Sequence, residues 1–166
     1  MVKAPLRPRP HFNLGAAMMA KGRLDDALDE YQTAEKMSLA PGTPISEREM
    51  TQLLTGMNIA DIMIRQGRYE EAHQILKQAW ILNPGFPGYS VNLGWFYLHE
   101  KQPTKAVLVL SDGIVHFRDY PWFPRKGSLY INLGLALEML GECEASREAY
   151  AVAGQYHEPY KAVTCS

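Results

Sequence analysis

The sequence is short of the features that mark several classes of protein. Its 17 basic and 18 acidic residues give a formal net charge of −1, so no bulk charge favours nucleic acid or an anionic membrane. No apolar run approaches the length that spans a bilayer, and the first residues lack the apolar stretch of a secretory signal. The two cysteines, Cys143 and Cys165, match no metal or redox spacing. We therefore expect a cytoplasmic protein with no membrane span and no nucleic acid partner.

Catalytic motifs are lacking as well. The five histidines are scattered, and no two of them stand three or four residues apart. We find no glycine-rich phosphate loop, no nucleophile elbow and no clustered set of metal ligands. The sequence thus predicts a protein that is not an enzyme and that holds neither a metal nor a cofactor, which leaves binding as the expected activity.

What the sequence does contain is an internal repeat. A motif of asparagine, an aliphatic residue and a small residue occurs four times, as Asn13-Leu14-Gly15, Asn58-Ile59-Ala60, Asn92-Leu93-Gly94 and Asn132-Leu133-Gly134. The shortest interval, from Asn58 to Asn92, gives the length of the repeating unit, which is about 34 residues. The other two intervals are longer, and one short insertion in each accounts for the difference. Such a fixed period indicates a repeat architecture.

Small and large residues recur at fixed places later in each unit. Small residues stand at Ala27, Ala72, Ala106 and Ser146, and again at Ala34, Ala79, Gly113 and Ala153; large ones between them are Tyr31, Leu76, Leu110 and Tyr150. A glycine divides three of the units, and Lys101-Gln102-Pro103 divides the other. This pattern predicts two antiparallel helices that approach closely at the small residues. One such hairpin cannot bury its apolar face alone, so the copies must stack.

At these residues the chain resembles the tetratricopeptide repeat family, most closely from Gly67-Arg68-Tyr69-Glu70-Glu71-Ala72 through Asn83-Pro84. The resemblance implies an all-α, right-handed superhelical solenoid of four stacked antiparallel helix pairs. The units cover about 8–41, 53–86, 87–120 and 127–160, in a repeat domain of residues 11–160. Residues 1–10 form an extended, basic, proline-rich arm in this interpretation, and residues 161–166 a short tail.

The two insertions lead to separate expectations. The first, residues 39–46, carries helix-start signals, so we expect the next helix to begin near Ile45 and to be longer than its counterparts. The second, residues 117–126, holds four aromatics and two prolines. We expect its aromatics to pack against the third and fourth units. The alternative is an exposed aromatic patch that serves as a second contact surface.

The resemblance also implies a binding site, because in this family the first helix of each pair lines a concave groove. The positions carried over to this chain are Phe12 and Asn13; Met57, Asn58, Asp61 and Arg65; Val91, Asn92, Trp95 and His99; and Ile131, Asn132, Leu135 and Glu138. Helical spacing agrees in the third unit, where 91, 95 and 98 share a face and 93, 94 and 97 face the partner helix. For Arg65, an ion pair with Asp61 four residues earlier is the simpler expectation.

The four repeated asparagines have two possible roles. An amide offers donors and an acceptor that match the backbone of an extended peptide, and the set resembles the asparagine ladder with which a glycosyltransferase repeat domain holds peptides. Alternatively, each amide bonds within the repeats, since a buried amide must find a partner. The sequence leaves both open.

We therefore predict a scaffold or adaptor that binds an extended peptide segment of a partner protein in a concave groove. The alternatives are a secretion-type chaperone that cradles an unfolded client, and the substrate-recognition domain of a larger enzyme such as a glycosyltransferase. The third unit has Val91 and Asn92 where chaperone-tail clamps of this family carry cations, so such a tail is not the expected ligand. Self-association through the end faces of the stack is a further possibility.

Overall fold

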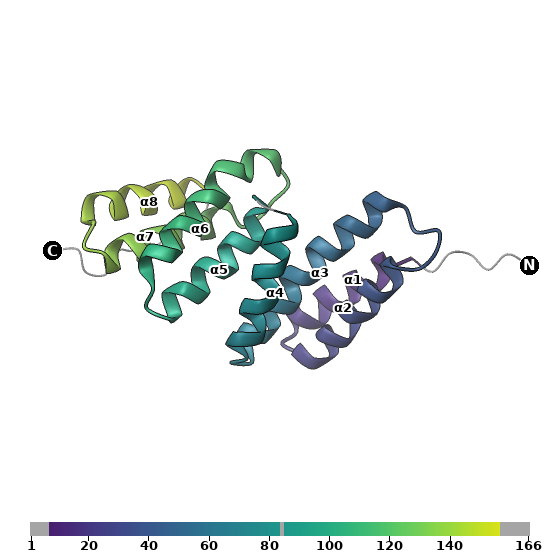
Figure 1. The fold of residues 1–166 in the computed structure, drawn as a ribbon. Coiled ribbons are helices and arrows are strands. Elements are labelled where there is room, and N and C mark those ends of the chain that lie inside the picture. The colour runs from purple at the N-terminus through teal and green to yellow at the C-terminus, as the bar shows by residue number, and fades with distance from the viewer. Residues whose placement is uncertain (1–6, 84, 157–166) are drawn as a thin grey trace, which may run out of the picture. The chain divides into compact units, whose positions relative to one another are not determined.

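The computed structural model describes residues 7–83 and 85–156, and this part of the chain is helical with no strand (Figure 1). Its α-helices are α1 (Arg9–Ala20), α2 (Leu24–Ser38), α3 (Ile45–Arg65), α4 (Tyr69–Leu82), α5 (Pro87–His99), α6 (Pro103–His116), α7 (Lys126–Met139) and α8 (Cys143–Gln155), with a 3-10 turn, η1 (Phe117–Asp119), after α6. Most of the basic arm, the end of the fourth unit and the tail lie outside the described residues. The all-α prediction is confirmed.

The chain divides within α4 into two compact units, unit 1 up to Ile75 and unit 2 from Leu76. In unit 1, α1 packs against α2, and α3 packs against both. Ala27, Tyr31 and Ala34 of α2 are buried at the centre. A methyl group on Gly15 of α1 would lie 2.9 Å from the ring of Tyr31. The two helix axes can therefore be this close only because the repeated small position is glycine here.

Unit 2 repeats the same arrangement. Helices α5 and α6 form one pair, α7 and α8 form the next, and α5 and α6 both pack on α7. A methyl group on Gly94 would lie 2.5 Å from Leu110, and one on Gly134 would lie 2.4 Å from the ring of Tyr150. The glycine of each asparagine motif thus lies against the large residue of the second helix, and the prediction that the two helices approach closely at small residues is confirmed.

Local sequence signals account for the ends of the helices. Helix α3 begins at Ile45 and has 21 residues, as the first insertion predicts. The turn between α5 and α6 places Lys101 at φ 54°, a left-handed conformation that glycine adopts in the other three hairpins. Helix α1 begins at Arg9, so residues 9 and 10 are helical and do not belong to an extended arm. Pro10 is tolerated in the first turn because the N–H that it lacks has no partner there.

The second insertion packs within unit 2. Phe86, which precedes α5, is fully buried, and its ring lies 5.2 Å from that of Tyr120, 6.0 Å from that of Trp122 and 6.1 Å from that of Phe123. Phe117 of η1 does not join this cluster. Its ring lies against that of Tyr130 of α7, with the two ring centres 6.5 Å apart. Phe117 thus packs against the fourth repeat as predicted, whereas Tyr120, Trp122 and Phe123 surround Phe86, the last residue of the second repeat. Trp122 keeps 47% of its surface exposed.

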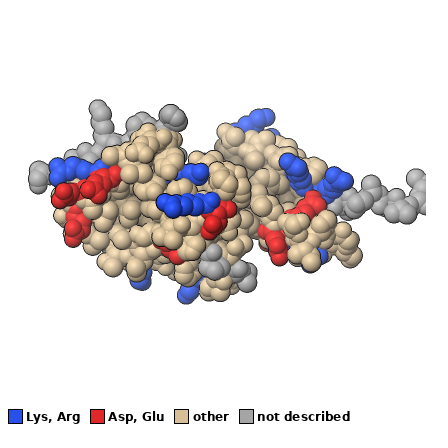
Figure 2. Space-filling view, turned by 90° about the horizontal axis from the view of Figure 1, so that it is seen from above, with Lys and Arg blue, Asp and Glu red and all other residues tan. Residues whose placement is uncertain are grey.

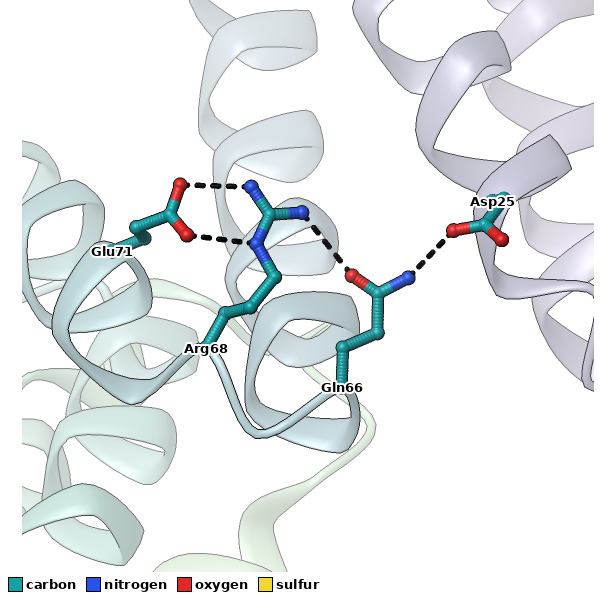
Figure 3. Close-up of polar contacts among 4 residues, drawn as sticks. All are labelled: Asp25, Gln66, Arg68 and Glu71. Atoms are coloured by element: carbon teal, nitrogen blue, oxygen red, sulfur yellow. Dashed lines mark hydrogen bonds and ion pairs between the residues drawn. The ribbon is translucent and has the colours of Figure 1, made fainter.

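A chain of polar contacts joins the first and second hairpins in unit 1 (Figure 3). Gln66, after α3, donates to Asp25 of α2 at 2.8 Å and accepts from Arg68 at 3.2 Å. Arg68 also donates two hydrogen bonds of 2.8 Å to Glu71 of α4. The hydrogen bond from Arg68 lowers the pKa of the Glu71 carboxyl. The turn between α3 and α4 is thereby held to the first turn of α2.

Candidate peptide-binding groove

A groove of about 570 Å³ lies in unit 1, where α1 runs beside the first half of α3. Its lining comes from the start of α1 and from one face of α3, and consists of Arg7, Arg9, Phe12, Asn13, Glu47, Met50, Thr51 and Leu54. The volume falls in the range of sites that hold small ligands or a few residues of a peptide.

The extra length of α3 creates this groove. Asn13 and Asn58 are equivalent in the repeat, so Arg9, four residues before Asn13, corresponds to Leu54, four residues before Asn58. Residues 45–53 of α3 consequently have no counterpart in α1. The lining positions 47, 50, 51 and 54 follow the spacing of one helical face, and 58, 61 and 65 continue that face toward the end of α3.

The floor of the groove is apolar. Phe12 is half-buried and its ring lies 5.5 Å from that of Tyr31, which fixes its orientation. Leu54 is half-buried, while Met50 keeps 44% of its surface exposed. The hydroxyl of Thr51 donates to the carbonyl of Glu47 at 2.7 Å, so it needs no partner from a ligand. An apolar side chain of a ligand can therefore replace water over these residues without leaving a buried polar group unpaired.

Polar and charged groups surround this floor. Asn13 is exposed and offers both a donor and an acceptor. Arg7 and Arg9 are exposed on the side of α1, and Glu47 is half-buried on α3. In Figure 2, blue and red side chains lie close to one another on the right-hand side of the view. Among the described residues of the lining, basic residues outnumber acidic ones by two to one.

The other expected groove residues of unit 1 lie further along α3. Met57 and Asn58 are half-buried. Arg65 pairs with Asp61 at 3.1 Å, so the simpler expectation for Arg65 is confirmed. Burial, with a smaller contribution from the Asp61 carboxylate, raises the pKa of Tyr31 to about 12.

Three of the expected groove residues of unit 2 are buried, which corrects their assignment to an open surface. Val91 is 1% exposed and Asn92 is 2% exposed, because α5 is covered by both α6 and α7. Asn92 accepts a hydrogen bond of 3.1 Å from Arg125, and Asn132 donates one of 3.3 Å to the carbonyl of Val91. Asn132 thus has the second role, bonding within the repeats, whereas Asn92 bonds to Arg125 of the second insertion.

The remaining expected residues of unit 2 stay closer to solvent. Trp95 is partly exposed and stacks on His99 with their ring centres 5.5 Å apart. Ile131 and Leu135 of α7 are half-buried. Glu138 accepts a hydrogen bond of 2.9 Å from the hydroxyl of Tyr150, so this carboxylate is engaged within its own hairpin.

Sequence reasoning missed six of the eight lining residues, namely Arg7, Arg9, Glu47, Met50, Thr51 and Leu54. The signal was present in the first insertion, which predicts a longer α3. Positions taken from a regular repeat cannot include the added turns, because those turns have no equivalent in the family pattern.

Two kinds of feature are absent from residues 7–83 and 85–156. No helix there has the length and hydropathy needed to cross a bilayer. No group of three or more histidine, cysteine or acidic residues in this part of the chain is arranged to hold a metal ion.

Comparison with known proteins identifies the repeat. Residues 63–121 match the family model described as tetratricopeptide repeat. Curated proteins give no match. Among solved structures, BtubC (BKLC) from P. vanneervenii aligns with a TM-score of 0.66 at 16% identity, over 95% of this chain and 68% of that one. The MamA RS-1 ArsTM double mutant aligns with a TM-score of 0.61 at 19% identity, over 90% and 74% of the two chains.

A third similar structure is TTC0263, a thermophilic TPR protein of Thermus thermophilus, with a TM-score of 0.53 at 19% identity, over 90% of this chain and 91% of that one. At such low identity these likenesses concern the fold. Residues 63–121 therefore match tetratricopeptide repeat sequence, and the fold is that of tetratricopeptide repeat proteins, as the resemblance implies.

Proposed function

We propose that this chain is a protein-interaction scaffold whose unit 1 groove binds an extended segment of a partner protein. Tetratricopeptide repeat proteins are generally scaffolds without enzymatic activity. The observation that carries the proposal is the open groove on α1 and α3, with an apolar floor and the exposed amide of Asn13 at its side. An extended peptide presents alternating N–H and C=O groups, which one amide side chain can bind in pairs.

The face of α3 extends the proposed site beyond the groove itself. Asn58 follows Leu54 by one helical turn, and Asp61 and Arg65 follow in the same register. Asn13 and Asn58 are the two repeated asparagines that are not buried. A peptide lying along α3 would therefore meet the apolar floor first and a second amide afterwards.

The size of the groove supports weak binding. One or two apolar side chains on the floor would contribute about 1.5–3 kcal/mol each. Hydrogen bonds from the two amides would add about 1 kcal/mol each. Ordering of the peptide offsets part of this sum, so we expect dissociation constants of about 10–100 μM rather than nanomolar values.

Peptides selected from a random library on the full chain provide the test. Met50→Glu places a charge on the floor, and because Met50 is partly exposed and glutamate favours helix, the fold should persist. We expect at least about tenfold weaker binding of the selected peptides. The matched control is Leu108→Glu, which changes an exposed apolar residue of α6 in unit 2. Equal affinities of wild type and Met50→Glu for every selected peptide would refute the proposal.

Peptide binding of this kind is common to the adaptor and to both alternatives considered from the sequence. A chaperone would bind many unrelated apolar segments through the groove. A scaffold would prefer one kind of segment, and the recognition domain of an enzyme would prefer that enzyme's substrates. The diversity of the selected peptides separates the first case from the other two.

A further inference from the structure

The charges around the unit 1 groove are unbalanced. Arg7 and Arg9 line it from the side of α1, and Glu47 is the one acidic residue in the lining among the described residues. Both arginines are exposed, and neither forms an ion pair with a residue of the described part of the chain. The neighbouring His11 differs, because it already contacts Glu30 at 2.7 Å. Two guanidinium groups are thus available to a ligand on the α1 side of the apolar floor.

The start of α1 adds to this positive potential. Its first turn contains no acidic residue, and no side chain within residues 7–83 and 85–156 caps its first N–H groups. The positive end of the helix dipole therefore lacks a compensating charge. The start of α3 differs because Glu47 lies in its first turn. Each effect is small alone, but all act on the α1 side of the groove.

From this arrangement we infer that the groove selects an acidic segment of the partner protein. Carboxylates of the segment lie over Arg7 and Arg9, and an adjacent apolar side chain contacts Met50 and Leu54. The inference rests on the proposed function, since it names the kind of segment that the same groove takes. A guanidinium group can bind a carboxylate through two parallel hydrogen bonds, which gives direction as well as attraction.

The rest of the chain makes this selectivity local. The formal net charge is −1, so no long-range attraction draws acidic partners toward the molecule. Nucleic acid shares the negative charge but needs many phosphate contacts for useful affinity. Two arginines next to an apolar floor suit a peptide with a few carboxylates and one apolar side chain better than a phosphate backbone.

The test uses the full chain and three labelled peptides in fluorescence anisotropy. The first is a short blocked peptide with a central leucine between glutamates, and the others carry glutamines or lysines in place of the glutamates. We expect the glutamate peptide to bind about fivefold more tightly than the glutamine peptide. The lysine peptide should bind most weakly. The difference should shrink in about 0.5 M salt, where screening is nearly complete.

Substitutions assign the selectivity to named residues. Arg9→Gln should weaken binding of the glutamate peptide about threefold and leave the glutamine peptide unchanged. Glu47→Gln should strengthen binding of the glutamate peptide by a similar factor, because it removes a like charge from the lining. Arg147→Gln is the matched control, since Arg147 is an exposed arginine of α8 in unit 2.

The outcomes separate this inference from the proposed function. Equal affinities for the glutamate and glutamine peptides, with both lowered by Met50→Glu, would overturn the charge selectivity and leave peptide binding intact. If neither peptide binds, and Met50→Glu leaves the affinity for every library-selected peptide unchanged, both the inference and the proposed function are refuted. Tighter binding of a single-stranded oligonucleotide than of the glutamate peptide would also overturn the inference.

Discussion

Ser146 of α8 has a buried hydroxyl that does not help to hold the fold together. Its side chain is fully buried, and its oxygen finds no hydrogen-bond partner in the part of the chain that the structure describes. The other three repeats carry alanine at this position, as Ala27, Ala72 and Ala106, and all of them are fully buried too. Ser146→Ala therefore gives the fourth repeat the residue that the other three repeats have at this position. We expect the substitution to stabilise the protein.

The magnitude follows from two contributions. A buried polar group without a partner costs about 1–3 kcal/mol, and the intrinsic helix propensity of alanine exceeds that of serine by about 0.5 kcal/mol. The van der Waals attraction of the removed oxygen atom offsets part of this gain. We expect the free energy of unfolding to rise by about 1–2 kcal/mol, which raises the Tm by about 2–8 °C for a chain of this size.

Urea unfolding followed by far-UV circular dichroism measures the change, and the m-value should stay the same. Thr55→Val is the contrasting variant, because the buried hydroxyl of Thr55 donates to the carbonyl of Thr51 at 2.8 Å. Removing that satisfied hydroxyl should leave stability unchanged or lower it by about 1 kcal/mol. If Ser146→Ala lowers the free energy of unfolding, the hydroxyl has a role that this reasoning omits, and the argument is refuted.

Four other predictions concern the packing and the turns. Gly94→Ala should lower the free energy of unfolding by about 1–3 kcal/mol in urea titrations, because its methyl group would lie 2.5 Å from Leu110; a neutral result would show that the helices can separate freely. Lys101→Gly should raise the Tm, since the residue stands at φ 54° and glycine there gains about 0.5–1 kcal/mol. The pKa of Tyr31 is raised to about 12, so its contribution to stability is complete below pH 10 and is lost as the pH rises toward 12; Tyr31→Phe should flatten the measured fall in Tm over that range, and an unchanged slope would contradict the assignment. Phe86→Ala should lower the free energy of unfolding by about 3–5 kcal/mol. It should also weaken the near-UV circular dichroism of the aromatic rings that surround Phe86.

Much of the fold could be predicted because the residues that start and end helices agree with the residues that pack between them. Pro87 and Pro103 stand at the observed starts of α5 and α6. The small residue Gly15 and the large residue Tyr31, both of which recur at fixed places in the repeat, lie against each other across the first hairpin. Such signals act locally or between neighbouring helices, so a single sequence carries them. The start of α1 was misplaced by two residues because Pro10 reads equally well as a breaker or as a first-turn residue.

The site was predicted less well because burial depends on what covers a helix. The asparagines of the repeat share one position, yet Asn13 is exposed and Asn92 is buried. Arg125, which hydrogen-bonds to Asn92, comes from the second insertion and has no counterpart in the first hairpin. The groove owes its far wall to the first insertion. In both places an insertion determines which residues of the repeat are buried and which are exposed. The repeat pattern does not include the insertions, so it cannot predict their effect.

The aromatic packing of residues 117–123 determines how this chain can be shortened. Repeat proteins are commonly trimmed one hairpin at a time to map where a partner attaches. A cut after His116 would remove Tyr120, Trp122 and Phe123 and strip the buried ring of Phe86 of its cover. A cut after Phe123 would keep that cover but leave Phe117 without Tyr130. The last two hairpins therefore behave as one indivisible block, and point substitutions will map a partner on unit 2 more faithfully than deletions.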